Sequence, residues 1–239
     1  MKTNWQIITE TENSLSNDCY KDCNSFCCSY KIILQNTRFM KNIATLHLTV
    51  DEYNYLLHAG RLQTGLDYRP LNIALLDDIS FEIITAKCTF DGLCHEHKYR
   101  SFLCKLYPVK PLVNYKGEIS SFEKGGIWQE KIFEKNPCTI DNDERLVNDK
   151  TLLIVEEFFK EPKNVFYYKC IDIVNRHIEE KICEIKNKNV GIEDSILIKE
   201  IELLYLKNIF IDFNKIKREA TDLFYSMQSF WGDKFVLDN

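Results

Sequence analysis

The sequence predicts an α+β fold: a loop-rich, cysteine-bearing half with a small β-sheet, packed on a mostly helical C-terminal part. Three observations lead to this prediction. Eight of the ten cysteines lie between Cys19 and Cys138. Short β-branched stretches occur in the same half, and the residues beyond it place apolar side chains at spacings of three and four. We therefore divide the chain into residues 1–145, which hold the cysteine cluster, and residues 146–239, which are expected to be helical.

The composition excludes several classes of protein. With 239 residues, of which 45% are hydrophobic and 28% charged, the chain can bury a core and is not expected to be disordered. The net charge of −5 argues against a nucleic-acid binder, which needs a clustered basic face. No apolar run approaches the roughly 18–20 residues that cross a membrane, and the sole glycine pair, at 125–126, forms no nucleotide-binding loop. The N-terminus shows no apolar secretory leader, so we expect a cytoplasmic protein.

The elements expected in the first half surround the cysteines. Thr49 and Glu52 form a capping-box pattern, so a helix is expected to begin there. Residues 79–85 are β-branched and partly alternating, which predicts a strand just before the second group of cysteines. The Lys-Gly pair at 116–117 stands between two apolar stretches and indicates a hairpin turn.

The second half reads as a series of amphipathic helices. Apolar residues recur at spacings of three and four over residues 152–185 and again over residues 196–230, with a break at residues 187–191. Cys170 and Cys183 fall in the first of these stretches, and we expect both on its buried face as small apolar residues. We interpret this half as a helical bundle or cap that packs on the cysteine-bearing half.

The first group of cysteines has a spacing that suits metal ligation. Cys19, Cys23 and Cys27 are four residues apart, so on a helix their thiols would share one face, and Cys28 follows directly. Three thiols at this spacing make a poor core and a good ligand set. In a reducing cytosol we expect metal binding before disulfides, with disulfides and inert thiols left open as alternatives.

The second group consists of Cys88, Cys94 and Cys104, with Cys138 as a further candidate. A turn signal at residues 91–92 would fold Cys88 back toward Cys94, as a chelating knuckle requires. Together the two groups predict a cysteine-ligated, metal-binding half over residues 1–145.

The histidines are interpreted as loop or surface residues rather than ligands. His95 and His97 alternate beside the second group, so in an extended chain only one of them could face a metal. His47, His58 and His177 are expected on the surfaces of helices or strands. No Ser-His-Asp order, paired-carboxylate motif or H-E-x-x-H is visible, so no hydrolase is predicted.

Further landmarks fall in order with the cysteines. Residues 48–52 read L-T-x-x-E, and residues 100–108 read R-x-x-x-C-x-L-Y-P. With the cysteines, these landmarks resemble the YkgJ-type family of zinc- or iron-chelating cysteine-cluster proteins, which also includes the flagellin lysine-N-methylases. The resemblance covers residues 15–140. It departs from the family pattern at Ser101, where the family has proline, and at Lys105, where it has arginine.

The resemblance implies a cysteine-ligated centre. We favour an iron–sulfur cluster of the [4Fe–4S] type over zinc, although thiolates suit both. The implied ligands are Cys19, Cys23, Cys27, Cys28, Cys88, Cys94, Cys104 and Cys138. They would fill two four-coordinate sites, or one cluster with thiols to spare. Arg100 matches the family arginine and is assigned to cofactor binding, through the thiolates or a carboxylate, with a structural ion pair as the alternative.

Three classes of function stay open. The first, favoured by the resemblance, is an enzyme that modifies a protein or peptide, such as a lysine N-methyltransferase that uses S-adenosylmethionine. The second is a carrier or sensor of iron or zinc. The third is a structural-zinc module whose aromatic-rich helical half binds a partner. The expected partner is a protein or peptide substrate, with no nucleic acid and no membrane. The sequence predicts neither catalytic residues nor the oligomeric state.

Overall fold

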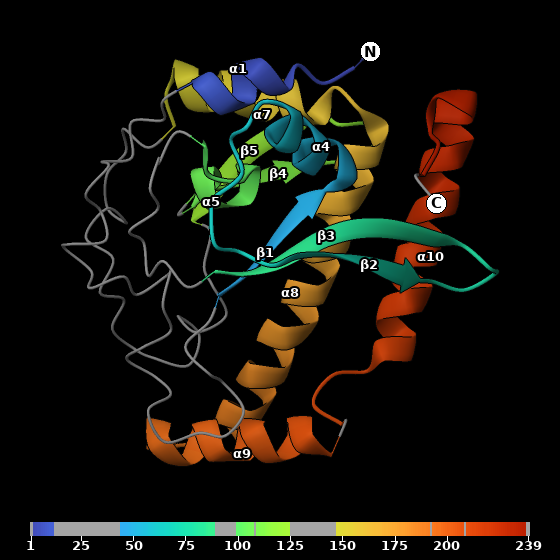
Figure 1. Cartoon of the computed structure of the whole chain (residues 1–239). Coiled ribbons are helices and arrows are strands. Elements are labelled where there is room, and N and C mark those ends of the chain that lie inside the picture. Colours follow the sequence, from blue (N-terminus) through green and yellow to red (C-terminus); the bar gives the residue numbers. More distant parts are fainter. Residues whose placement is uncertain are drawn as a thin grey trace.

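A computed structural model of the chain describes residues 2–11, 44–88, 99–107, 109–124, 147–191, 193–207 and 209–237 (Figure 1). Across these ranges, two small antiparallel sheets lie beside a group of C-terminal helices. The long helix α8 (Pro162–Lys188) runs through the middle of the molecule in Figure 1, behind the three-stranded sheet. The predicted α+β fold is therefore confirmed.

The first sheet has three antiparallel strands in the order β1-β3-β2. Their bounds are β1 (Ala44–Thr49), β2 (Tyr68–Ala74) and β3 (Ser80–Cys88). Strand β3 is the strand predicted just before Cys88, and β1 leads directly into helix α4 (Val50–His58). The Thr49 side chain accepts a hydrogen bond from the Glu52 N–H at 3.1 Å, so the predicted helix start is confirmed.

The second sheet is the predicted hairpin. Helix α5 (Phe102–Leu106) precedes it, and β4 (Val109–Val113) pairs with β5 (Ile119–Lys124). Asn114 fastens the turn, because its side-chain oxygen accepts from the backbone N–H groups of Lys116 and Glu118. At the same turn the Gly117 N–H donates to the Asn114 carbonyl.

The helices of the C-terminal part are, besides α8, α7 (Asp149–Phe159), α9 (Asp194–Leu206) and α10 (Phe213–Trp231), followed by the 3₁₀ turn η4 (Gly232–Lys234). The predicted helical character is confirmed. The pattern over residues 152–185, however, covers two helices. The chain turns at Lys160 and Glu161, and Pro162 opens α8, because proline has no N–H to leave unpaired there.

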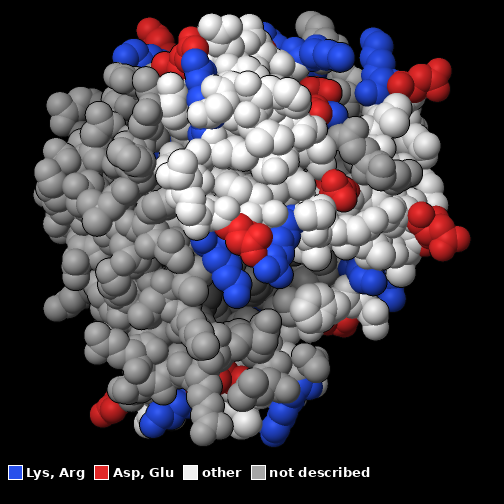
Figure 2. All heavy atoms as spheres, viewed as in Figure 1, with Lys and Arg blue, Asp and Glu red and all other residues white. Residues whose placement is uncertain are grey.

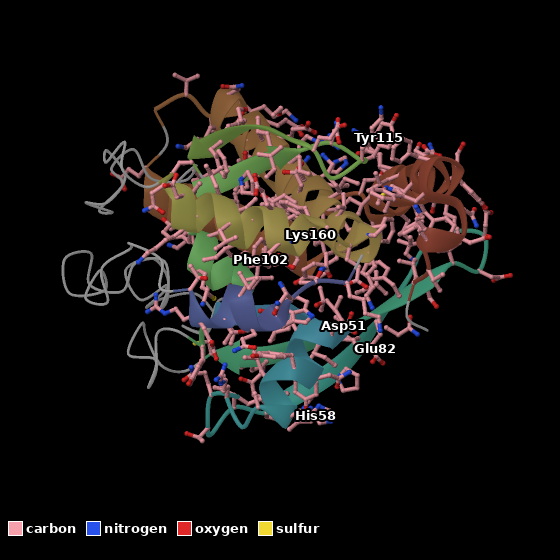
Figure 3. All side chains as sticks on the ribbon, turned by 90° about the horizontal axis from the view of Figure 1, so that it is seen from above. Asp51, His58, Glu82, Phe102, Tyr115 and Lys160 are labelled. Carbon is pink, nitrogen blue, oxygen red and sulfur yellow. The ribbon has the colours of Figure 1, made fainter. Side chains whose placement is uncertain are left out.

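One hydrophobic cluster draws on both halves of the chain. Its aromatic members are Trp5 from α1, Phe81 from β3, Phe102 from α5, Phe158 and Phe159 from α7, and Tyr167, Tyr168 and Phe166 from α8. The Phe102 and Phe158 rings stack with 3.6 Å between their centroids. Figure 3 shows Phe102 in the interior, while Tyr115 and His58 lie at opposite edges. The short helix α5 is therefore held by the C-terminal helices.

The two cysteines of α8 differ in burial. Cys170 is buried, as predicted, and burial raises the pKa of its thiol. The prediction was wrong for Cys183, which is exposed. The adjacent Ile182 and Ile185 are the residues that turn inward at this level of the helix, so Cys183 faces outward.

The prediction of surface histidines holds for His58, which is exposed, and fails for His177. His177 is only 7% exposed, because its Nε2 lies 3.1 Å from Glu219 Oε1 where α8 meets α10. His47 on β1 is half-buried, and burial lowers the pKa of its imidazole.

The first residues of the chain are fixed to the helices α7 and α8. Helix α1 (Trp5–Glu10) begins at Asn4, whose side chain accepts from the N–H groups of Gln6 and Ile7. The Asn4 N–H donates to Glu157 Oε1 at 2.7 Å, and the Thr3 N–H donates to Glu161 Oε2 at 3.3 Å. Helix α1 was not among the elements predicted from the sequence.

The surface shown in Figure 2 carries basic and acidic side chains in mixed groups around a wide uncharged area. Ion pairs contribute to such mixing, for example Lys163 with Asp51 at 2.5 Å. Of the helices in the described ranges, none combines the length and the apolar character needed to cross a membrane.

Replacing Gly117 by alanine is expected to destabilise the fold by about 1–3 kcal/mol, because Gly117 has φ +82° and an added Cβ would lie 2.9 Å from the Phe159 carbonyl oxygen. Gly65→Ala is the matched control, since Gly65 has φ +84° with no atom within 4 Å of an added Cβ. Chemical denaturation of both variants separates the contact from the backbone strain. Equal losses at the two positions would contradict the close approach of the hairpin to α7.

Candidate metal centre

Three of the predicted site residues lie within the described ranges: Cys88, Cys104 and Arg100. The other predicted ligands lie outside them, namely Cys19, Cys23, Cys27, Cys28, Cys94 and Cys138. Over the described ranges, no group of three or more His, Cys, Asp or Glu side chains is arranged to hold a metal ion. The described part therefore contributes two thiols to the predicted centre, and their surroundings decide what they can do.

Cys88 is the last residue of β3 and is 6% exposed. Alternation along the strand buries Ile84, Ala86 and Cys88. Cys88 is paired with Ala44, the first residue of β1. The thiol therefore belongs to the end of the sheet at which β1 begins.

Cys104 lies in α5 and is half-buried. Helix α5 has only five residues, too few to be stable without tertiary support. That support comes from a carboxylate at its start and from the burial of its neighbour Lys105. Arg100, half-buried, stands two positions before the helix.

Glu52 supplies the carboxylate. It is 4% exposed, and its Oε1 accepts a hydrogen bond from the Phe102 N–H at 2.6 Å. Burial raises the pKa of Glu52 from 4.5 to about 7, against the opposing effects of the Phe102 hydrogen bond and the Lys105 charge. Glu52 thus links the start of α4 to the start of α5.

Lys105 is a buried cation, 5% exposed. Its ammonium donates to the carbonyl oxygens of Ile8 and Thr9, both at 2.7 Å, and of Thr11 at 3.3 Å. These carbonyls belong to the end of α1, where a cation is favoured by the helix dipole. The residue after Cys104 therefore ties α5 to the end of α1.

Tyr167 brings α8 into the same cluster. It is 4% exposed, and its hydroxyl has no hydrogen-bond partner among the described residues. Its pKa is raised well above the usual range by burial first, and then by the negative charges of Glu52 and Cys104. Glu52, Cys104 and Tyr167 are therefore within electrostatic reach of one another in a low-dielectric interior.

The ends of several described segments meet around these residues. Thr11 lies beside α5 through its contact with Lys105, and Lys124 at the end of β5 pairs with Val109, shortly after α5. In Figure 1 the end of α1, helix α5, the start of β1 and the end of β3 all lie toward the same side of the molecule. Residues 12–43, 89–98 and 125–146, which carry the other six predicted ligands, connect at these ends.

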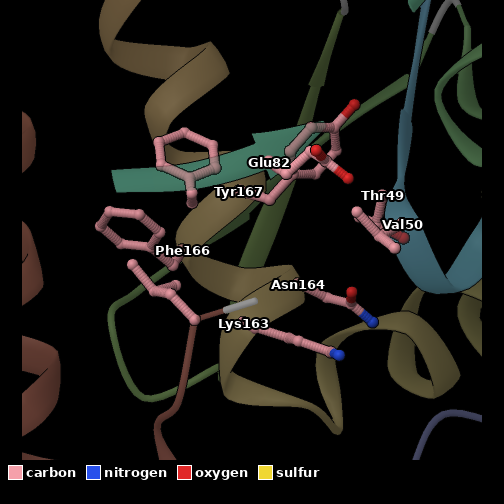
Figure 4. Close-up of a pocket in the computed structure, with 9 residues that line it drawn as sticks. Thr49, Val50, Glu82, Lys163, Asn164, Phe166 and Tyr167 are labelled. Carbon is pink, nitrogen blue, oxygen red and sulfur yellow. The ribbon is translucent and has the colours of Figure 1, made fainter. Parts of the chain in front are cut away.

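The described cavity beside Tyr167 is a different feature. It measures about 20 Å³ and is lined by residues that include Thr49, Glu82, Lys163 and Asn164 (Figure 4). This volume suits a single water molecule and is too small for an organic cofactor. Its charged lining is already engaged, since Lys163 pairs with Asp51.

The donor set of the described part fits a thiolate-bound metal. Cys88 and Cys104 offer soft sulfur ligands, and a buried cation adjoins Cys104, which favours the thiolate form. Sequence reasoning missed the burial of Glu52 and Lys105. The capping box explained Glu52 locally, and the only signal for Lys105 was its place beside a predicted ligand.

Comparisons of the chain with protein-family models, with curated proteins and with solved structures found no match. The resemblance to the YkgJ-type family accordingly remains an expectation based on the motifs.

Proposed function

We propose that this chain is a cytoplasmic, cysteine-ligated metalloprotein whose centre is an iron–sulfur cluster or zinc. The observation that carries the proposal is the convergence of chain ends around the described thiols. Cys88 ends a strand at the start of β1, and Cys104 lies in a helix tied to the end of α1. Segments holding six more cysteines join the fold at these ends, so a few residues of connecting chain would suffice to gather four or more thiolates.

The chemistry that such a centre supplies is that of its metal: electron transfer or substrate activation for an iron–sulfur cluster, and structural support for zinc. The chain's own residues would hold the thiolates in place through Glu52 and Lys105. Modification of a protein or peptide, with S-adenosylmethionine as a cosubstrate and Arg100 as a cofactor-binding residue, is the activity we favour on the resemblance.

The test is the metal and sulfide content of protein purified without air, compared across four variants. Cys88→Ser and Cys104→Ser are expected to lose most of the metal, because thiolate is the ligand and serine is a poor substitute for soft metals. Cys170→Ser is the buried control for Cys88, and Cys183→Ser is the control for Cys104, both on α8. The controls should keep the wild-type metal content.

The outcome also separates the classes of function. Matched iron and sulfide with a visible absorption band would support the iron–sulfur centre, and S-adenosylmethionine binding would be assayed next. Inert zinc in whole-number amounts, with unfolding upon chelation, would favour the structural module. Labile, substoichiometric metal would favour a carrier. A wild-type protein without metal, or equal metal loss from Cys170→Ser, would contradict the proposal.

A further inference from the structure

The ammonium of Lys105 occupies an unusual place for a lysine. It is 5% exposed, and its three printed acceptors are neutral carbonyl oxygens of α1 and the residue that follows it. Burying a cation is costly unless it serves as a counter-charge or is required by a network. A helix C-terminus offers only a partial negative charge.

The groups around Lys105 are those that a buried cation would influence. Cys104 precedes it in α5, and Glu52 senses its charge, which lowers the pKa of that carboxylate against the effect of burial. Tyr167 in turn senses both Glu52 and Cys104. A positive charge at Lys105 therefore acts through the same low-dielectric interior that contains the Cys104 sulfur.

We infer that Lys105 is a positioning and charge-compensating residue of the metal centre, one that stabilises the thiolate of Cys104 and fixes α5 on the end of α1. This inference rests on the proposed function. A centre of several thiolates is anionic, and charged or hydrogen-bonding groups behind the ligands tune its affinity for metal. Lys105 supplies such a charge from the residue next to a ligand, and its three hydrogen bonds keep that charge from moving away.

The same hydrogen bonds give Lys105 a second role in placing the ligands. Thr11 is the last described residue before residues 12–43, which contain Cys19, Cys23, Cys27 and Cys28. By holding the Thr11 carbonyl, Lys105 fixes where that stretch begins relative to Cys104. One side chain thus sets both the charge beside Cys104 and the starting point of the first cysteine group.

The experiment is a titration of the metal-free chain with Co²⁺ under anaerobic conditions, followed by thiolate-to-cobalt charge-transfer absorption and a competing chelator. Lys105→Met and Lys105→Gln remove the charge, and the glutamine amide retains donors for the α1 carbonyls. Both should bind Co²⁺ about 10–100-fold more weakly than wild type. Lys105→Arg keeps the charge and should bind more tightly than either neutral variant.

Asn4→Ala is the control for structure alone. It removes the N-cap of α1, which Lys105 holds at the other end, and leaves the charge in place. Its Co²⁺ affinity should stay near wild type although α1 is weakened.

Equal Co²⁺ affinity of wild type and the neutral variants would overturn the role of Lys105 while leaving the metal centre standing. A loss in Asn4→Ala as large as in Lys105→Gln would also overturn it, since the effect would then be structural. A wild-type chain that shows no thiolate-to-cobalt band would overturn the proposed centre together with this inference.

Discussion

Phe158→Ala is expected to lower the free energy of unfolding by about 3–5 kcal/mol, the range for removing a fully buried phenylalanine. Phe158 has no exposed surface and stacks on Phe102 at 3.6 Å between ring centroids. Its ring also meets Trp5 and Phe159 edge-on. The variant therefore opens a cavity at the point where α1, α5 and α7 meet, and part of the loss will fall on the support of α5.

The measurement is urea unfolding followed by circular dichroism, with Phe213→Ala as the matched control. Phe213 begins α10 and is 56% exposed, so the same substitution there should cost much less. Similar losses for the two variants would show that Phe158 does not lie at the centre of the core described here.

Glu52→Gln is expected to remove a pH dependence of stability worth about 3 kcal/mol, since each pKa unit corresponds to 1.36 kcal/mol. In the folded protein burial raises the pKa of Glu52 from 4.5 to about 7. Below pH 4.5 the carboxyl is protonated in both states and exerts no effect. As the pH rises toward 7, the unfolded chain ionises first, so the folded state becomes progressively less stable until both states are ionised.

Glutamine keeps an oxygen for the Phe102 N–H and cannot ionise. The variant should match wild type near pH 4.5 and exceed its stability at pH 8, measured by thermal or urea unfolding across that range. Glu156→Gln, on the exposed face of α7, is the control and should leave the pH profile unchanged. A wild-type stability that rises between pH 5 and 7 by the contribution of Glu52 would contradict the burial of its carboxylate.

What the sequence predicted correctly is encoded over a few neighbouring positions. The Thr49 cap is three residues from Glu52, the alternation that defines β3 has a period of two, and the Asn114 turn is closed by residues 116–118. Each of these depends on short-range geometry alone. The overall α+β class follows from the same signals taken together.

The surroundings of the candidate site depend on contacts between distant positions. The Glu52 carboxylate meets the Phe102 N–H 50 positions later, and the Lys105 ammonium meets the Ile8 carbonyl 97 positions earlier. Neither partner leaves a periodic signal near the other. A lysine next to a cysteine also reads as a surface residue, because lysine is rarely buried without a partner. The charge environment of Cys104 was therefore beyond sequence reasoning, whereas the cysteine itself was not.

The attachment of the first residues to α7 and α8 sets an order for folding during synthesis. Thr3 and Asn4 bind Glu161 and Glu157, which leave the ribosome 158 and 153 residues later. Until then Trp5 and Ile8 have no buried site to enter, and α1 is too short to persist alone. The carbonyls that Lys105 requires are therefore fixed in place only after residue 161 has been made. A nascent chain completes the environment of Cys104 late, so the thiols emerge well before the fold that is to organise them.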